Sequence, residues 1–214
     1  MDELEILKKD WKEKGQTEPK LSYNQIYNML FKRSTSIVKW IFIISILELV
    51  FWMGIFLITP KSSFEVIEKL GATPILYGFN ILHYLVVFVF IYYFYKNYTT
   101  IKVTDNTKTL MRSILKTRKT VRYFVIYNLV AFALTIIIIN IFYYTQSELL
   151  LQIMADSYGS EIKNPDDFIT VFFIVQVIAG IVMILLLLLF YRLIYGILLG
   201  KLKRNYRELE RIEV

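Results

Sequence analysis

Residues 181–190 read IVMILLLLLF, a stretch with no polar side chain. It belongs to the last of four long, nearly uncharged apolar runs, at residues 37–59, 73–95, 122–144 and 168–191. Each run is close to the ~20 residues that an α-helix needs to cross a hydrocarbon core about 30 Å thick. A backbone in lipid must satisfy its own hydrogen bonds, and the runs lack the apolar/polar alternation of a barrel strand. The sequence therefore predicts an all-α polytopic membrane protein with four transmembrane helices.

The charges between the runs differ from loop to loop. Residues 96–121 form a strongly basic loop, whereas residues 60–72 and 145–167 together carry more acids than bases. Because positively charged loops stay on the cytoplasmic side, the basic loop is predicted to lie inside. With an even number of spans, the N- and C-termini are then both cytoplasmic.

This topology divides the chain into three parts. Residues 1–36 are expected to form cytoplasmic helices that end in an elbow at the membrane surface. Within them, Ser22 and Gln25 have the spacing of a capping box, which predicts that a helix begins near Tyr23. Residues 37–200 are the transmembrane four-helix bundle, and residues 201–214 continue the fourth helix as a cytoplasmic extension.

Two apolar stripes outside the spans are candidates for binding a partner. They consist of Leu4, Leu7 and Trp11 near the N-terminus and of Leu202, Tyr206 and Leu209 near the C-terminus. An apolar stripe on a water-facing helix must be covered. For the second stripe, three partners could pack against it: the chain's own helices, a second copy of the chain, or a partner protein.

Ionisable side chains inside the spans are candidate functional groups, because such a group at mid-bilayer costs about 3 kcal/mol on insertion scales. Glu48 is the centre of the first run, and His83, the only histidine, is close to the centre of the second. Antiparallel neighbours would place the two at similar depth, where a neutral pair or an ion pair would satisfy both. A structural contact and a proton-coupled site both fit this pattern.

Amides and glycines in the spans are candidates for helix packing. A polar layer nearer the outer ends of spans two, three and four consists of Asn80, Asn140 and Gln176. These amides predict an interhelical hydrogen-bond network, with a small outward-facing pocket as the alternative. Gly180 is compatible with tight packing inside the bundle, and Gly196 with Gly200 forms a G-x-x-x-G pattern that is also typical of helix dimers.

Composition and motifs limit the possible chemistry. The net charge of +7 sits beside the spans, where topology and anionic lipid headgroups account for it, so no nucleic-acid partner is expected. The chain has no cysteine, which excludes thiolate metal sites and cysteine nucleophiles. It also lacks the H-E-x-x-H, G-x-S-x-G, G-x-G-x-x-G and G-x-x-x-x-G-K motifs. We therefore expect no cofactor, no metal site and no enzymatic activity.

Three stretches of the sequence carry a resemblance to other proteins. They are DELEILKKDW at residues 2–11, IYNML at 26–30 and SIVKWIFIISILE at 36–48. At these positions the chain resembles a group of uncharacterised four-span proteins from Bacteroidetes bacteria, which implies an inner-membrane location. Some of that group carry the label of a carotene-cleaving monooxygenase. Carotenoid-cleaving dioxygenases hold iron with four histidines on a β-propeller, whereas this chain has one histidine and no propeller strands, so that activity is rejected.

Two main functional hypotheses follow, beside a residual third, an intramembrane enzyme of unrecognised type. The first is a non-catalytic inner-membrane interaction protein, an accessory subunit or regulator of a membrane complex that acts through its cytoplasmic helices. The alternative is a small proton-coupled transporter or ion-driven component that uses Glu48, since small multidrug transporters are similar in having four spans and a glutamate in the first. The long cytoplasmic extensions and the strong charge asymmetry depart from that family. The expected partners are the lipid bilayer and either another protein or a second copy of the chain in a homo-oligomer.

Overall fold

The computed structural model describes residues 22–60, 62–102, 106–158 and 164–213. The helices are α2 (Tyr23–Ile58), α3 (Ser62–Lys69), α4 (Thr73–Lys102), α5 (Thr107–Thr145), α6 (Ser147–Tyr158) and α7 (Pro165–Glu213). The described part of the chain contains no strand, and the all-α prediction is confirmed. Helices α2, α4, α5 and α7 are long and apolar enough to cross a membrane, and each contains one of the four apolar runs, except that Thr59 of the first run caps α2.

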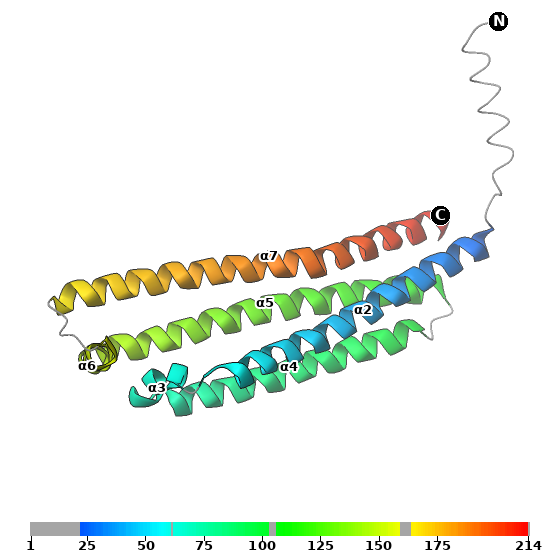
Figure 1. Cartoon of the computed structure of the whole chain (residues 1–214). Helices are drawn as coiled ribbons and strands as arrows, with labels where there is room; N and C mark the ends of the chain where they lie inside the picture. The colour runs from blue at the N-terminus through cyan, green and yellow to red at the C-terminus, as the bar shows by residue number, and fades with distance from the viewer. Residues whose placement is uncertain (1–21, 61, 103–105, 159–163, 214) are drawn as a thin grey trace, which may run out of the picture.

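The four long helices lie side by side in an elongated up-and-down bundle (Figure 1). Around the bundle, α2 contacts α4, α4 contacts α5, α5 contacts α7, and α7 closes the ring against α2. The short helices α3 and α6 lie at one end, and the start of α2 and the end of α7 lie at the other (Figure 1). Leu70, Leu150 and Ile153 pack together at the end that carries α3 and α6. Nε2 of Gln146 also donates a hydrogen bond to the carbonyl of Leu70 there, at 2.8 Å.

Helix α2 begins where the sequence predicts. The Ser22 hydroxyl accepts a hydrogen bond from the Gln25 amide at 3.3 Å, and Oε1 of Gln25 accepts one from the Ser22 amide at 2.8 Å, which completes the capping box. From Tyr23 the helix continues without a break to Ile58, so the predicted elbow at the membrane surface is wrong. Residues 23–53 contain neither glycine nor proline, so nothing in them ends or kinks the helix.

Exposed apolar side chains form a belt around the bundle. Large exposed hydrophobic residues occur throughout residues 40–58 of α2, 75–95 of α4, 123–144 of α5 and 171–197 of α7. Outside these ranges, the large exposed hydrophobic residues described on the four helices are Tyr23, Met29 and Leu115. Exposed apolar surface of this extent is typical of a protein that lies in a membrane. We call this surface the apolar belt.

Beyond the apolar belt the bundle continues as a helical stalk. The stalk comprises residues 23–39 of α2, 96–102 of α4, 107–122 of α5 and 198–213 of α7. Three of these segments have 16 or 17 residues, about 24 Å of helix at a rise of about 1.5 Å per residue. The main hydrophobic core continues from the belt region into the stalk, where the side chains exposed by at most 2% include Leu30, Ile101, Leu110, Ile114, Leu202 and Leu209.

The C-terminal apolar stripe lies in this core. Leu202 and Leu209 are fully buried, and Tyr206 packs against the same cluster, which also contains Leu30 of α2 and Leu110 of α5. The structure therefore shows that the chain's own helices bury this stripe, which is one of the three possibilities that the sequence left open. The assignment of these three residues as partner-binding candidates is therefore wrong, because their side chains are already packed within the stalk. The other candidate stripe, Leu4, Leu7 and Trp11, lies outside the described residues.

Removal of a side chain from the stalk core should lower the stability of the protein. Leu202→Ala removes a fully buried side chain and is expected to lower the free energy of unfolding by about 2–5 kcal/mol through lost burial and the cavity left behind. Leu115→Ala is the matched control, because Leu115 is 45% exposed on the same stalk, and it should change stability by no more than about 0.5 kcal/mol. Chemical unfolding of both variants in mild detergent measures the difference. Equal effects of the two substitutions would contradict a closed stalk core.

Candidate functional site

Glu48 lies in the part of α2 that carries the apolar belt and is 7% exposed. The hydroxyl of Tyr191 donates to its Oε1 at 2.5 Å, and the hydroxyl of Tyr195 donates to its Oε2 at 3.1 Å. Because residues four apart lie on one face of a helix, both hydroxyls reach the carboxyl group from the same side of α7. Glu48 therefore links α2 to α7 through two hydrogen bonds between membrane-spanning segments.

The predicted pairing of Glu48 with His83 is not formed, and within the described residues no hydrogen bond joins the two side chains. Nδ1 of His83 is buried without a hydrogen-bond partner. The imidazole ring instead stacks on Tyr127, with ring centroids 5.6 Å apart and planes at 10°. The physical reason is the helix order, because α2 lies between α4 and α7 and the Glu48 side chain bonds to α7.

A cavity of about 350 Å³ brings Glu48 and His83 into one site. Its lining comes from all four long helices and from α3, and the polar lining includes Glu48, Asn80, His83 and Asn128. Aromatic rings form much of the remaining wall, including Trp52, Phe56, Phe64, Tyr84 and Tyr191. A largely apolar cavity of this size with a few polar groups is typical of a small-molecule site. In the described ranges, no three His, Asp or Glu side chains lie together as metal ligands would.

The cavity is separated from the stalk by an aromatic cluster. Phe124 lines the cavity and is 1% exposed. Phe90, Phe94 and Tyr195 pack edge-on against it, with centroids 5.5, 5.4 and 6.0 Å from its ring. We call these four residues the aromatic plug. It lies on the stalk side of Glu48, so the cavity extends from Glu48 toward the end of the bundle that carries α3.

The predicted layer of Asn80, Asn140 and Gln176 does not form an interhelical network. Nδ2 of Asn80 donates to the carbonyl of Leu76, and Nδ2 of Asn140 donates to the carbonyl of Ile136, each at 2.9 Å within its own helix. Gln176 is half-buried, and no hydrogen bond joins the three amides in the part of the chain that is described. Asn80 lines the cavity, whereas Asn140 and Gln176 do not. Asn80 and Asn140 therefore donate within their own helices, and Oδ1 of Asn140 is buried without a partner among the described residues.

The glycines of α7 occupy two different environments. Gly180 is buried, and a Cβ atom there would lie 3.4 Å from side-chain atoms of Ile136 on α5, so its small size serves packing inside the bundle. Gly196 and Gly200 are exposed, and a Cβ atom at Gly200 would meet no heavy atom within 4 Å. The G-x-x-x-G pattern thus takes no part in packing between helices of this chain.

Sequence reasoning missed Tyr191 and Tyr195 as site residues, because tyrosines at the end of a span are typical interfacial anchors. The signal that could have found them is their spacing of four residues, which places two hydroxyl donors on one face of a span. A single glutamate in another span is the acceptor that such a pair requires.

Together, these features define a helical membrane protein with a largely apolar cavity among its spans and a closed helical stalk beyond them. The chain belongs to the DUF8845 family, a domain of unknown function, whose family model matches residues 24–214. The match runs from the start of α2 to the end of α7, so spans and stalk belong to one family unit. Comparisons with curated proteins and with solved structures give no match.

The link between α2 and α7 makes a second prediction. Tyr191→Phe and Tyr195→Phe are each expected to lower the free energy of unfolding by about 0.6–2 kcal/mol, the range of interhelical hydrogen bonds in membranes. The double variant should lose more than the sum, because it leaves the buried carboxyl group with no donor. Tyr92→Phe, at an exposed tyrosine of the apolar belt, is the control and should have little effect. Strictly additive losses, measured by unfolding in mixed micelles, would show that the two bonds are independent.

Proposed function

We propose that the protein is a non-catalytic membrane scaffold, an accessory subunit or regulator of a bacterial inner-membrane complex, that holds a partner protein on its stalk. The observation that carries this proposal is the stalk itself, which extends about 24 Å beyond the apolar belt and has a closed core. Helices that only had to cross the bilayer could end at the headgroups. A preformed rigid surface loses little conformational entropy on binding, which favours a docking role.

The surface of the stalk favours an acidic partner. Its exposed cations on α5 include, besides Arg122 at the edge of the apolar belt, Lys108, Arg112, Lys116 and Lys119, which recur at helical spacing, and α5 contains no acidic residue. We call the latter four residues the basic stripe. Leu115 lies among them and is 45% exposed. Complementary charge would orient a partner and raise the rate of association. The excess of positive charge on the stalk also supports a cytoplasmic location for it and for both termini.

A pull-down tests the scaffold proposal. The reversal of two charges in Arg112→Glu/Lys116→Glu should lower the recovery of a co-purifying partner by about tenfold or more, because like charges across an interface cost several kcal/mol. Lys203→Glu/Arg207→Glu makes the same change of charge at exposed positions of α7 and should leave recovery near that of the natural protein. Quantitative mass spectrometry after purification in mild detergent, at native expression, gives the measurement.

Two results of this experiment would contradict the proposal. One is purification of the natural protein alone, with light scattering that shows a monomer. The other is an equal loss of the partner in both variants, which would indicate general attraction to acidic surfaces and no docking site on α5. A second copy of the chain as the only partner would support the homo-oligomer in place of a complex with another protein.

The cavity favours a second candidate, a small transporter or ion-driven component that uses Glu48. A carboxyl group next to aromatic rings is suited to an organic cation, because the carboxylate balances the charge and ring faces attract it. Glu48, Trp52 and Tyr84 offer this combination in about 350 Å³. The aromatic plug lies between this cavity and the stalk, so passage of a solute across the bundle requires the plug to move.

A flux assay tests this second candidate. In proteoliposomes with a pH gradient, uptake of a small aromatic cation such as benzyltrimethylammonium is expected for the natural protein and is expected to fall at least about tenfold in Glu48→Gln, since the neutral amide no longer balances the charge. Glu65→Gln removes an exposed carboxylate of α3 and serves as the control. Absence of uptake by the natural protein, or unchanged uptake by Glu48→Gln, would remove transport through Glu48.

A further inference from the structure

A second cavity, of about 460 Å³, lies between α2 and α7 in the stalk. Its cationic lining consists of Lys32 and Arg33 from α2 and of Lys201 and Arg204 from α7. Ile37 lines it as well, at the end nearest the apolar belt. We call this cavity the basic groove. The four cations come from segments far apart in the sequence, and helix packing brings them to one place.

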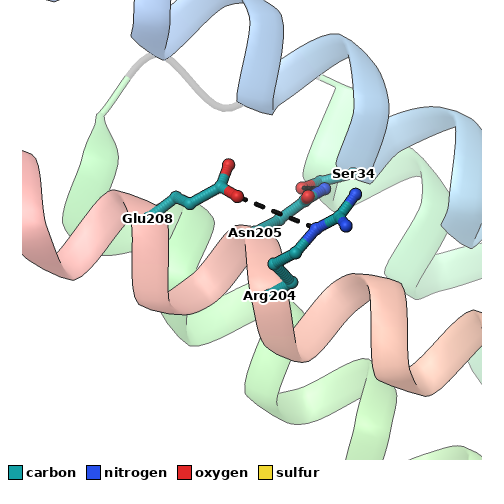
Figure 2. A network of polar contacts seen from close by, with 4 residues as sticks. All are labelled: Ser34, Arg204, Asn205 and Glu208. Atoms are coloured by element: carbon teal, nitrogen blue, oxygen red, sulfur yellow. Dashed lines mark hydrogen bonds and ion pairs between the residues drawn. The ribbon is translucent and has the colours of Figure 1, made fainter. Parts of the chain in front are cut away.

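A buried hydrogen bond fixes the two walls of the basic groove. Nδ2 of Asn205 donates to the hydroxyl of Ser34 at 3.0 Å, and both residues are at most 2% exposed (Figure 2). Because this bond joins α2 to α7 beside the cations, it holds the spacing of the two walls. Among the described residues, the four cations make one ion pair, in which Nε of Arg204 lies 3.7 Å from Oε1 of Glu208 (Figure 2). Since the Arg204 side chain is 70% exposed, that pair contributes little and leaves the groove positive.

The depth of the basic groove matches the lipid headgroups. The apolar belt ends at Trp40 on α2 and at Ile197 on α7. Ser36 and Lys201 are four residues beyond these positions, and Arg33 and Arg204 are seven, which corresponds to about 6 and about 10 Å of helix. A headgroup layer is about 5–8 Å thick on each side of the hydrocarbon core, so Ser36 and Lys201 lie within it, and the long side chains of Arg33 and Arg204 can reach back to it from just beyond. Two antiparallel helices thus independently place the groove at the edge of the membrane.

We propose that the basic groove binds the phosphate of an anionic phospholipid, whose acyl chains lie against the apolar belt along α2 and α7. Arginine and lysine at headgroup depth are suited to a phosphate, and arginine can hold two of its oxygens at once. Trp40 and Ile197, 53% and 56% exposed, continue from the groove into the belt and offer apolar surface to the chains. A soluble phosphate would use the cations alone, so the continuity of charged and apolar surface favours a lipid.

A specific lipid site differs from the general attraction of basic residues to an anionic membrane surface, because only the cations that line the groove would contribute to binding. Lys102 on α4 and Lys203 on α7 are exposed seven and six residues beyond the apolar belt, at a depth similar to that of Arg33 and Arg204, but they do not line the groove. General attraction to an anionic surface would treat them like Arg33 and Arg204, whereas a lipid site would not. These residues therefore provide a matched control with the same change in charge.

Lipid binding to the full-length protein in mild detergent tests the site, with phosphatidylglycerol and phosphatidylcholine as probes and native mass spectrometry as the measurement. Arg33→Gln/Arg204→Gln should weaken phosphatidylglycerol binding about 25-fold, because each cation near an anionic headgroup contributes about fivefold. Lys102→Gln/Lys203→Gln should weaken it by less than about threefold. Arg33→Lys/Arg204→Lys, which keeps both charges, should retain most of the binding, which separates loss of charge from loss of the arginine side chains.

The outcomes separate the possible ligands. Selective loss in the groove variant, with phosphatidylcholine bound weakly throughout, supports the lipid site. Equal loss in both neutralised variants, or equal affinity for the two lipids, would overturn it, because attraction would then not depend on the groove. Displacement of phosphatidylglycerol by inorganic phosphate or glycerol phosphate at comparable concentration would also overturn it, since the groove would then recognise a free phosphate.

Discussion

The four long helices pass from an apolar belt into a polar stalk without a break, and this change of surroundings decides how each part is held together. In the belt, residues that face lipid are as apolar as residues that face the bundle, so burial of apolar surface provides little drive for packing. Close approach at Gly180 and the bonds of Glu48 to Tyr191 and Tyr195 link helices there. In the stalk, the hydrophobic effect acts fully, and Leu202 and Leu209 are completely buried.

This difference also explains what the sequence could and could not predict. The apolar runs predict the spans, the Ser22 and Gln25 pattern predicts the start of α2, and the spacing of Leu202 and Leu209 predicts that the fourth helix continues. The partner of Glu48 was not predicted, because a uniformly apolar span has no periodicity that shows which face meets which neighbour, and the one signal was the four-residue spacing of Tyr191 and Tyr195. In the polar stalk the apolar residues do have such a periodicity. It shows that one face of the helix is buried, but it does not identify the helix or protein that packs against this face.

The two binding surfaces proposed for the stalk lie on different faces of the bundle. The basic groove is between α2 and α7, whereas the basic stripe is on the exposed face of α5, which packs between α4 and α7 and touches α2 only slightly. An anionic lipid in the groove would therefore leave α5 open to a protein partner. It would also neutralise charge between α2 and α7, where Asn205 and Ser34 already fix their distance, and so would strengthen the stalk that presents the partner surface.

The cavity and the stalk are connected through the same two helices. A cation bound at Glu48 would have to share the carboxyl group with Tyr191 and Tyr195, so it would disturb the link between α2 and α7 in the belt. Tyr195 is also part of the aromatic plug through its contact with Phe124. Because α2 and α7 continue unbroken into the stalk, a change in their spacing at Glu48 would reach the walls of the basic groove. Binding of a ligand in the cavity would then change the surface that the stalk presents to a partner. A binding cavity and a scaffold role are therefore compatible in one molecule.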